Sequence, residues 1–279
     1  MTKQLKLGLI GDNIAMSQSP KLHQLAGLQS GIPVSYTRLV PKDMGLSFEA
    51  LFSGLRQEGY HGVNVTYPYK ERAAGLVTVA NPLVRAIGAV NTVVLAGATP
   101  HGYNTDYSGF IHAYRTVRGN AALGKVVLIG AGGVGKAIAF ALLTLGTTEI
   151  VCVDLEREKA RALANALVAT GTSCLVTIAR RVEDAVEAAD GIINCTPLGM
   201  VGIGGTPLNA ALMAGANWVF DAVYTPVQTQ FLQDAQAVGL TAISGYALFF
   251  GQGIDAWRLF SGTEPDVAAL RAALTGDTS

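Results

Sequence analysis

The chain is long enough for two domains and carries no charge excess that would favour a nucleic-acid partner. Of its 279 residues, 50% are hydrophobic and 14% are charged, which predicts a large core and excludes a disordered protein. Lys and Arg number 20, as do Asp and Glu, so no overall field exists to hold a polyanion or an acidic membrane surface. Glycine is over-represented at 33 residues, which indicates many tight turns and close backbone approaches.

The first 100 residues alternate short apolar runs with helical stretches, which is typical of a mainly parallel α/β sheet. The predicted strands are residues 6–11, 35–40 and 62–66, and the predicted helices are residues 20–31 and 47–59. Residues 86–95 are predicted to end this block with a turn and a further strand. The polar, glycine-containing segment 102–106 is typical of a hinge or crossing point between domains.

A second α/β series begins at Lys125. Its predicted strands are residues 126–129, 149–154, 174–177, 191–195 and 218–221, and its predicted helices are residues 135–145, 156–169 and 183–189. Two last helices, residues 246–260 and 266–274, have no strand partners and are expected to return to the first domain. The sequence therefore predicts two α/β domains, one of residues 1–105 completed by residues 241–279, the other of residues 106–240.

The most apolar stretch, residues 126–146, contains the single charge Lys136 and is about as long as a membrane span. Glycines near its front break it into a strand, a turn and a helix. The turn is Gly130-Ala131-Gly132-Gly133-Val134-Gly135, which satisfies G-x-G-x-x-G. In that motif the first glycine permits the turn, the second lets backbone approach a pyrophosphate, and the third allows close helix packing. A doubly wound, Rossmann-type dinucleotide-binding domain is therefore predicted, and no membrane segment.

Asp154 decides which nicotinamide cofactor is expected. It ends the next strand 24 positions after Gly130, near the spacing at which a carboxylate binds the adenosine ribose hydroxyls. A carboxylate about 4 Å from the 2′-phosphate of NADP would cost about 4 kcal/mol per pair of unit charges at an effective dielectric constant near 20. NAD is therefore the predicted cofactor. Arg157 argues the other way by position, but between Glu156 and Glu158 it is predicted to be a solvated residue at a helix start.

Cysteine usage and the first residues bear on the compartment. Cys152, Cys174 and Cys195 lie far apart among apolar neighbours and form neither a disulfide framework nor a CxxC metal pattern. They are predicted to be small hydrophobic core residues. The chain start has no apolar stretch of signal-peptide length, so a cytoplasmic protein is expected. The histidines show no ligand spacing, and no metal site is predicted.

Several further motifs resemble, in order and spacing, those of the shikimate/quinate dehydrogenase family, and the likeness covers essentially the whole chain. They are Ser17-Gln18-Ser19-Pro20 with His23, Asn64-Val65-Thr66-Tyr67-Pro68-Tyr69-Lys70, Gly88-Ala89-Val90-Asn91-Thr92, Asn104-Thr105-Asp106, Asn194-Cys195-Thr196-Pro197-Leu198-Gly199-Met200, and Gly245 with Gln252. The resemblance implies an enzyme that interconverts shikimate and 3-dehydroshikimate, or quinate and 3-dehydroquinate, with a nicotinamide cofactor. It makes the first domain the substrate-binding catalytic domain.

The resemblance also implies roles for individual residues. Ser17 and Ser19 would hold the substrate carboxylate, Lys70 and Asp106 would form the catalytic pair, and Tyr224 would lie near the nicotinamide and the substrate. The residues that would contact ring hydroxyls are Thr66, Asn91 and Gln252. The residues that would bind the cofactor are Gly130, Ala131, Gly132, Gly133, Val134, Gly135, Asp154, Asn194, Thr196 and Gly245.

The chemistry gives its own reasons for some of these roles. Removing a hydride from a secondary alcohol leaves a proton, which needs a base within about 2.6–3.2 Å of the hydroxyl. Lys70 follows a strand at its carboxyl edge, where α/β sheets place ligands, although a surface lysine is the plain alternative. Asp106 alone would be a helix N-cap or a turn residue, and beside Lys70 it would favour the ammonium form. The proton path through Lys70, the pair or a water therefore stays open.

Ser17 and Ser19 have an alternative role as capping residues before Pro20, and the two roles are compatible. Two hydroxyls with nearby backbone N–H groups would hold a carboxylate without any arginine. The sequence departs from the family pattern in three places. Met16 replaces a histidine, Tyr67 and Tyr69 replace smaller or Phe-type residues, and Asp154 stands where NADP-using members carry Asn-Arg-Thr.

The substrate is therefore less defined than the reaction. Ser19 favours shikimate, because the quinate-using bacterial branch often has threonine there. The first hypothesis is an NAD-dependent oxidoreductase acting on shikimate, with quinate as the alternative main substrate. The second is an NAD-binding sensor without turnover. The expected partner is the small-molecule substrate, and neither nucleic acid nor a membrane is expected. The chain is expected to be a monomer or a homodimer.

Overall fold

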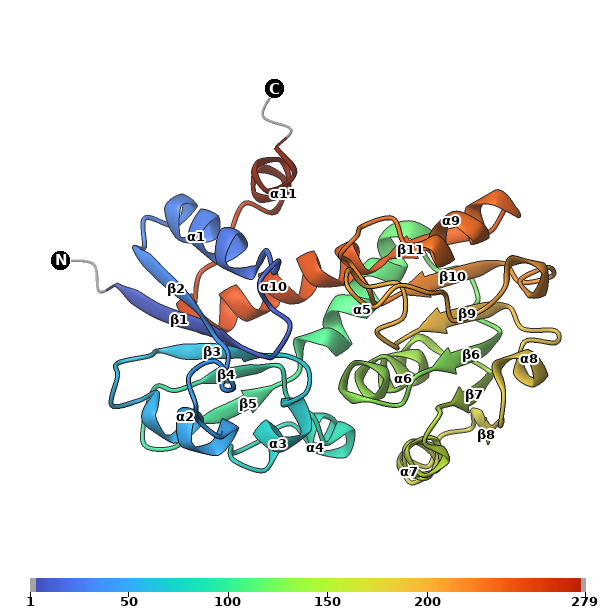
Figure 1. The fold of residues 1–279 in the computed structure, drawn as a ribbon, viewed down its shortest axis with the longest axis horizontal. Coiled ribbons are helices and arrows are strands. Elements are labelled where there is room, and N and C mark those ends of the chain that lie inside the picture. The colour runs from blue at the N-terminus through green and yellow to red at the C-terminus, as the bar shows by residue number, and fades with distance from the viewer. Residues whose placement is uncertain (1–3, 277–279) are drawn as a thin grey trace. The chain divides into compact units, whose positions relative to one another are not determined.

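The computed structural model describes residues 4–276 and consists of two units (Figure 1). The first unit runs to Thr105 and resumes at Gln252, and the second is Asp106–Gly251. The return to the first unit comes later than the expected residue 241. Residues Thr241–Ser244 form a strand, β11, that pairs with β10 (Trp218–Asp221) and so belongs to the second unit.

The first unit is built on a five-stranded sheet with the order β2-β1-β3-β4-β5. Its strands are β1 (Leu5–Ile10), β2 (Val34–Leu39), β3 (Gly62–Val65), β4 (Thr92–Val94) and β5 (His101–Tyr103). The first three are parallel, as the alternating pattern predicts, and β4 and β5 add an antiparallel edge. β5 is a strand where the sequence suggested only a hinge, and the unit boundary follows it directly.

Short helices connect these strands, and the C-terminal part of the chain packs back onto them. The helices are α1 (Ser19–Gln29), α2 (Phe48–Gly54), α3 (Lys70–Ala74), α4 (Pro82–Ile87), the second part of α10 (Gly245–Ser261) and α11 (Val267–Thr275). α11 packs against α1, and a β-carbon at Gly253 in α10 would lie 2.6 Å from the Leu22 side chain of α1. The expected return to the first domain is thus confirmed for α11 and for α10 from Gln252 on, whereas the first part of α10 belongs to the second unit.

The second unit is a six-stranded parallel sheet with the order β11-β10-β9-β6-β7-β8. Its remaining strands are β6 (Lys125–Ile129), β7 (Glu149–Val153), β8 (Leu175–Ile178) and β9 (Gly191–Asn194). The chain winds outward from β6 in one direction and then from β9 in the other, which is the doubly wound order of a dinucleotide-binding fold. The predicted fold class is confirmed.

The helices of the second unit include two that the sequence analysis missed, α5 and α9. The full set is α5 (Thr105–Arg118), α6 (Gly133–Leu145), α7 (Arg157–Val168), α8 (Val182–Ala185), the 3-10 turn η1 (Ala210–Leu212), α9 (Gln230–Ala237) and the first part of α10. The apolar stretch 126–146 is strand β6, a glycine turn and helix α6, as predicted. Among residues 4–276, no helix has both the length and the apolar character needed to cross a membrane.

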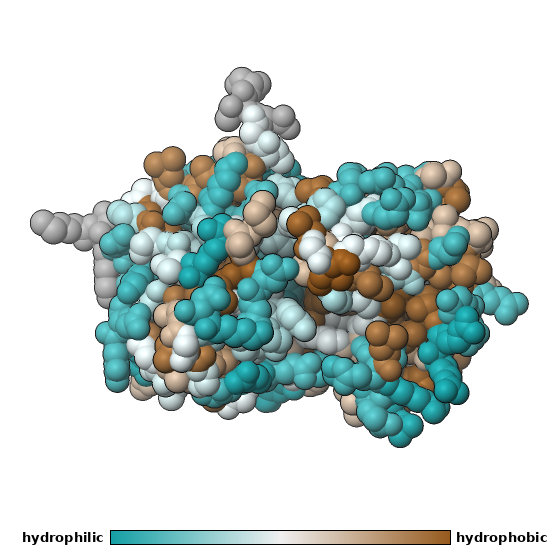
Figure 2. Space-filling view, in the orientation of Figure 1, coloured by the Kyte–Doolittle hydropathy of each residue, from teal (hydrophilic) through white to brown (hydrophobic). Residues whose placement is uncertain are grey.

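The surface in view is mixed in hydropathy. In Figure 2 both units show hydrophilic and hydrophobic residues mixed over the face in view.

Of the three cysteines, Cys152 and Cys195 are buried and Cys174 is partly buried, and all three are free thiols. Burial raises the pKa of the Cys152 thiol to about 12, so it is an inert core residue.

Candidate active site

The two serines of the SxSP motif lie together at the start of α1. Ser17 Oγ donates to Ser19 Oγ over 3.2 Å, and the Ser19 backbone N–H donates to Ser17 Oγ over 3.3 Å. Both residues are almost fully buried, at 8% and 7% exposure. Pro20 stands in the first turn of the helix, where its missing N–H costs nothing. The structure therefore brings the two hydroxyls together.

Arg38 joins this cluster, although the sequence analysis did not select it. It is the fifth residue of β2, and its guanidinium Nη2 donates to the Ser17 carbonyl oxygen over 2.7 Å. The residues are 21 positions apart and no motif links them. Only the pairing of β2 beside β1 brings Arg38 to the loop that carries Ser17. The structure thus places one arginine beside the two serines, and the expectation of a carboxylate site without any arginine stays untested.

Asn91 lies at the centre of a buried hydrogen-bond network in the first unit. Its Nδ2 donates to Thr105 Oγ1 over 3.0 Å and to Gln252 Oε1 over 3.4 Å. Its Oδ1 accepts from the Thr105 backbone N–H over 2.8 Å and from Thr92 Oγ1 over 3.1 Å. Two of the predicted hydroxyl-binding residues, 161 positions apart in sequence, are therefore neighbours.

Asn64 of β3 supports the Asn91 segment through hydrogen bonds. Its Nδ2 donates to Thr92 Oγ1 over 3.1 Å, and its Oδ1 accepts from Tyr36 over 2.8 Å. The backbone N–H of Val65 donates to the Asn91 carbonyl over 2.8 Å. Asn64, Thr92 and Thr105 lay within the quoted motifs but were given no role, because their contacts depend on the pairing of β3, β4 and β5.

Thr66 and Lys70 follow β3 at its carboxyl end, as predicted. The Thr66 backbone N–H donates to the Ile10 carbonyl over 2.8 Å, and the Tyr69 N–H donates to the Thr66 carbonyl over 2.9 Å. Lys70 is half-buried and begins α3, and its carbonyl accepts from the Val90 N–H over 3.0 Å. This last bond ties the backbone of Lys70 to the residue before Asn91.

Asp106 is the first residue of the second unit and lies in the first turn of α5. It is 3% exposed and follows Thr105, whose N–H is held by Asn91. The backbone of Lys70 is thus bonded to Val90, and Asp106 directly follows a residue bonded to Asn91. The catalytic pairing of Lys70 and Asp106 stays a prediction.

His23 is a core residue in the first unit. Its ring stacks on Tyr36 with centroids 5.1 Å apart and an angle of 8° between the planes. It is 1% exposed, and burial lowers the pKa of the imidazole to about 3, although a hydrogen bond with Asn64 opposes the shift. His23 is therefore neutral at ordinary pH.

The glycine turn of the second unit shows three different reasons for glycine. Gly130 has a φ of +101°, a conformation that side chains disfavour. A β-carbon at Gly135 would lie 1.9 Å from the Gly130 carbonyl oxygen, so the turn and the helix touch. A β-carbon at Gly132, in contrast, would meet none of the described heavy atoms within 4 Å. Packing within the protein therefore does not require glycine at 132. A ligand whose atoms approach the backbone closely would require it, and a pyrophosphate is such a ligand.

Asp154 lies directly after β7 and reaches back to the glycine turn. Its Oδ2 accepts from the Ala131 backbone N–H over 2.7 Å, and its Oδ1 accepts from the Glu156 N–H over 2.8 Å. Each oxygen keeps a second lone pair for a ribose hydroxyl. The carboxylate is therefore fixed beside the turn, where the sequence spacing predicted it.

Asn194, a predicted cofactor residue, has its side chain fully engaged within the protein, and its contact with a cofactor stays a prediction. It is 0% exposed, and its Nδ2 donates to the Leu198 carbonyl over 3.1 Å and to Asp221 Oδ1 over 2.9 Å. Its Oδ1 accepts from the Thr196 N–H over 3.0 Å and from Thr196 Oγ1 over 2.7 Å. These four bonds use the whole capacity of an amide. Asn194 therefore positions the loop after β9 that carries Thr196.

Asp221, which ends β10, is the buried carboxylate of this region. It accepts from Asn194, from the Val223 N–H over 3.0 Å and from Thr229 Oγ1 over 2.6 Å. Burial raises the pKa of this carboxyl to about 6, while the three hydrogen bonds oppose the shift. Asp221 thereby joins the loop after β9, the loop after β10 and the start of α9.

Tyr224 follows Asp221 and stacks on Phe249 of α10, with ring centroids 4.7 Å apart and an angle of 12°. Gly245 begins α10, and a β-carbon there would lie 2.6 Å from the carbonyl oxygens of Asp221 and Val223. Glycine at 245 is therefore explained by the close approach of the helix to the loop that carries Tyr224.

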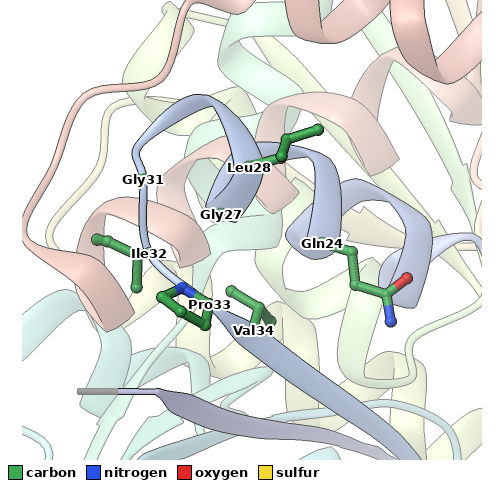
Figure 3. Close-up of a pocket in the computed structure, with 7 residues that line it drawn as sticks. All are labelled: Gln24, Gly27, Leu28, Gly31, Ile32, Pro33 and Val34. Atoms are coloured by element: carbon green, nitrogen blue, oxygen red, sulfur yellow. The ribbon is translucent and has the colours of Figure 1, made fainter. Parts of the chain in front are cut away.

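A hollow at the end of α1 is separate from these residues. It is lined mainly by apolar groups, with Gln24 as its polar side chain (Figure 3). The lining residues are Gln24, Gly27, Leu28, Gly31, Ile32, Pro33 and Val34. None of the predicted site residues is among them. In the part of the chain that the structure describes, no three His, Cys, Asp or Glu side chains are grouped as metal ligands.

Comparisons with known proteins match this organisation. The family model described as the shikimate dehydrogenase substrate binding domain matches residues 9–93. Another, described as NADP oxidoreductase coenzyme F420-dependent, matches residues 125–203, which contain the glycine turn. The quinate/shikimate dehydrogenase (NAD(+)) of Corynebacterium efficiens is 40% identical over 273 residues, which cover 95% of this chain and 96% of the relative. The chain belongs to the shikimate/quinate dehydrogenase family.

Solved structures of this family share the fold. The quinate dehydrogenase from Corynebacterium glutamicum in complex with NAD has a TM-score of 0.88 and 36% identity, with 98% of this chain and 99% of that chain covered. The shikimate 5-dehydrogenase from Thermus thermophilus in complex with NADP(H) and shikimate has a TM-score of 0.83 and 31% identity, with the same coverage.

The shikimate/quinate dehydrogenase family includes users of both cofactors. The shikimate dehydrogenase (NADP(+)) of Streptomyces avermitilis is 38% identical over 276 residues, which cover 95% of this chain and 93% of the relative. Family membership alone therefore does not select NAD or NADP. The distinguishing observation within this chain is Asp154, held by Ala131 and Glu156 at the end of β7.

Proposed function

We propose that this protein is an NAD-dependent oxidoreductase that interconverts shikimate and 3-dehydroshikimate at the ring 3-hydroxyl, with quinate and 3-dehydroquinate as the alternative pair. The observation that carries the proposal is the Asn91 cluster. It joins Asn91 to Gln252 and Thr105, and so gathers amide and hydroxyl groups suited to a ring with several hydroxyls. Relatives named quinate/shikimate dehydrogenase (NAD(+)) support it.

NAD is the proposed cofactor because Asp154 places a fixed carboxylate beside the glycine turn. A ribose diol donates two hydrogen bonds to such a group, whereas a 2′-phosphate would be repelled by it. Gly132, whose β-carbon position is open, allows the backbone to approach the pyrophosphate. When bound, NAD supplies the hydride acceptor.

The chain's own residues have the following proposed roles. Ser17 and Ser19 hold the substrate carboxylate, and Thr66, Asn91 and Gln252 hold ring hydroxyls. Lys70 and Asp106 bind the reacting hydroxyl and take up its proton, and Tyr224 lies on the nicotinamide side. The proposed cofactor contacts are Gly130, Ala131, Gly132, Gly133, Val134, Gly135, Asp154, Asn194, Thr196 and Gly245.

The test is a matrix of kcat/KM for shikimate and quinate, each with NAD and NADP. We expect turnover with NAD and shikimate to exceed turnover with NADP by at least tenfold. A higher value for quinate would select the alternative substrate. NAD binding by calorimetry with no turnover of either acid would select the sensor and contradict the proposed reaction.

Lys70→Ala tests the catalytic assignment. We expect kcat to fall by at least about 100-fold, because general acid–base groups contribute about 10²–10⁴-fold. Lys6→Met is the matched control, since Lys6 lies at the amino end of β1 and donates to the Glu58 carbonyl. Its kcat should stay within about twofold of the wild type. Unchanged turnover in Lys70→Ala would remove Lys70 from the mechanism.

We propose a cytoplasmic location and a monomeric or homodimeric state. The three free thiols support a reducing compartment. Cell fractionation tests the first proposal, and light scattering of the purified protein tests the second.

A further inference from the structure

We propose that Arg38 supplies the positive charge that recognises the substrate carboxylate, and that it makes the enzyme selective for acids over their neutral esters. This inference rests on the proposed function, in which Ser17 and Ser19 hold that carboxylate. It adds a residue that neither the motifs nor their spacing indicated.

The first support is position. The Arg38 guanidinium donates to the Ser17 carbonyl over 2.7 Å, and Ser17 Oγ is hydrogen-bonded to Ser19 Oγ over 3.2 Å. One cation and two hydroxyls therefore gather within one small region of the first unit. Arg38 pairs in register with Leu9, so it lies near the carboxyl end of the parallel strands β1 and β2. Ligands of α/β sheets bind at that end.

The second support is that the charge of Arg38 has no carboxylate partner among the described residues. Among residues 4–276, no carboxylate forms an ion pair with its guanidinium. The carboxylate that precedes the SxSP segment, Asp12, is already engaged. It pairs with Lys42 over 2.6 Å and accepts from the Tyr69 hydroxyl over 2.6 Å.

The third support is the donor geometry of arginine. A guanidinium has five N–H donors, and the bond to the Ser17 carbonyl uses one of them. That bond limits the freedom of an exposed side chain, so less entropy is lost when an anion arrives. Serine hydroxyls orient a carboxylate but do not distinguish it strongly from an ester. A fixed cation does distinguish them, because only the acid carries a charge.

The expected size of the effect follows from Coulomb's law. Unit charges about 6 Å apart change an affinity by about 3-fold at a dielectric constant of 80 and by about 100-fold at 20. Arg38 is exposed, so we expect a value between these limits, about tenfold.

The experiment compares shikimate with its methyl ester in the wild type, Arg38→Gln and Arg38→Lys. Arg38→Gln should raise KM for shikimate about tenfold and leave KM for methyl shikimate within about twofold, with kcat little changed. Arg38→Lys keeps the positive charge but loses the paired N–H donors of the guanidinium. Its KM for shikimate should therefore lie between the values of the wild type and Arg38→Gln. Raising salt from about 20 to about 500 mM should increase KM for shikimate in the wild type more than in Arg38→Gln, because screening acts on the charge.

Arg56→Gln is the matched control. Arg56 is also an exposed arginine of the first unit, and its guanidinium donates to the carbonyls of Gly97 and Ala98 in the β4–β5 turn. Its removal should leave KM for both compounds within about twofold of the wild type. A KM that rises equally for acid and ester in Arg38→Gln would show a structural role only and would overturn the inference. No change for the acid would also overturn it.

Calorimetry separates failure of this inference from failure of the proposed function. If the wild type binds shikimate without turnover, the proposed reaction fails. In that case calorimetry still tests Arg38: the inference predicts that Arg38→Gln binds shikimate about tenfold more weakly than the wild type and binds the methyl ester equally well. If turnover is normal and the two proteins bind shikimate equally, the inference about Arg38 fails alone. If the wild type does not bind shikimate, both fail.

Discussion

Ala131 donates its backbone N–H to the carboxylate of Asp154 over 2.7 Å, and this bond joins the glycine turn to the end of β7. The residue that we propose to select the cofactor thus also supports the glycine turn through this hydrogen bond. The two roles separate experimentally, because one depends on charge and the other on hydrogen-bond acceptance.

Asp154→Asn should reverse much of the preference for NAD. The amide keeps one acceptor for Ala131 or Glu156 but loses the charge that repels a 2′-phosphate. We expect the ratio of kcat/KM for NAD to that for NADP to fall about 10- to 100-fold, well below the full Coulomb estimate because the residue is partly exposed. The decisive measurement is KM for NADP, which should decrease. Damage to the turn alone would raise KM for both cofactors.

Gly132→Ala and Gly135→Ala should have opposite effects on stability and binding. At Gly132 the added methyl meets no described atom within 4 Å, so the free energy of unfolding should change by less than about 0.5 kcal/mol while KM for NAD rises about tenfold or more. At Gly135 the methyl would meet the Gly130 carbonyl, and the loss of stability should be at least about 1–3 kcal/mol. Urea unfolding and NAD titration of both variants provide the check. Equal stability losses would contradict the ligand-based reason for Gly132.

Asp221 should contribute a stability that decreases as the pH rises. Its pKa in the folded protein is about 6 and its ordinary value is 3.8, so the folded state holds the proton more tightly. The contribution is complete below about pH 4 and is lost as the pH rises through 6, with a limit of about 3 kcal/mol. Asp221→Asn should remove this dependence and be neutral or stabilising at pH 8. Asp221→Ala should destabilise, because Asn194, Val223 and Thr229 lose their acceptor. If the free energy of unfolding of Asp221→Asn decreased more steeply above pH 6 than that of the wild type, Asp221 would not be the source of this pH dependence.

His23, in the first unit, should contribute a stability that decreases as the pH falls, which is the opposite of the pH dependence expected from Asp221. Its folded pKa is about 3 and its ordinary value is 6.5, so the unfolded chain takes up a proton that the folded chain refuses. The stability is complete above pH 6.5 and falls by up to about 1.4 kcal/mol per pH unit toward pH 3. His23→Phe preserves the stacking on Tyr36 and should flatten the decrease between pH 6.5 and 4. Urea unfolding of both proteins at several pH values measures this, and an unchanged slope would exclude His23 as its source.

Local spacing made much of the second unit predictable. The strand, turn and helix of residues 126–146 follow from apolar runs interrupted by glycines, and the position of Asp154 follows from one strand–helix–strand repeat. The short helix α9 was missed because it has only eight residues, although Phe231, Leu232 and Ala235 form a buried apolar face. β11 was missed because its four residues, Thr241–Ser244, gain their stability from pairing with β10.

Some features of the site follow from the sequence alone, and others depend on the fold. The sequence by itself determined the residue types at the site, the glycine turn and the carboxylate at 154, since these depend on neighbours along the chain. Only the tertiary structure decided that Arg38 hydrogen-bonds to Ser17 and that Asn91 hydrogen-bonds to Gln252. It also decided that the side-chain amide of Asn194 hydrogen-bonds to the loop after β9. These contacts join residues brought together by strand pairing and by the returning helix α10. A hydrogen bond across 161 positions is set by the fold and leaves no periodic trace in the sequence.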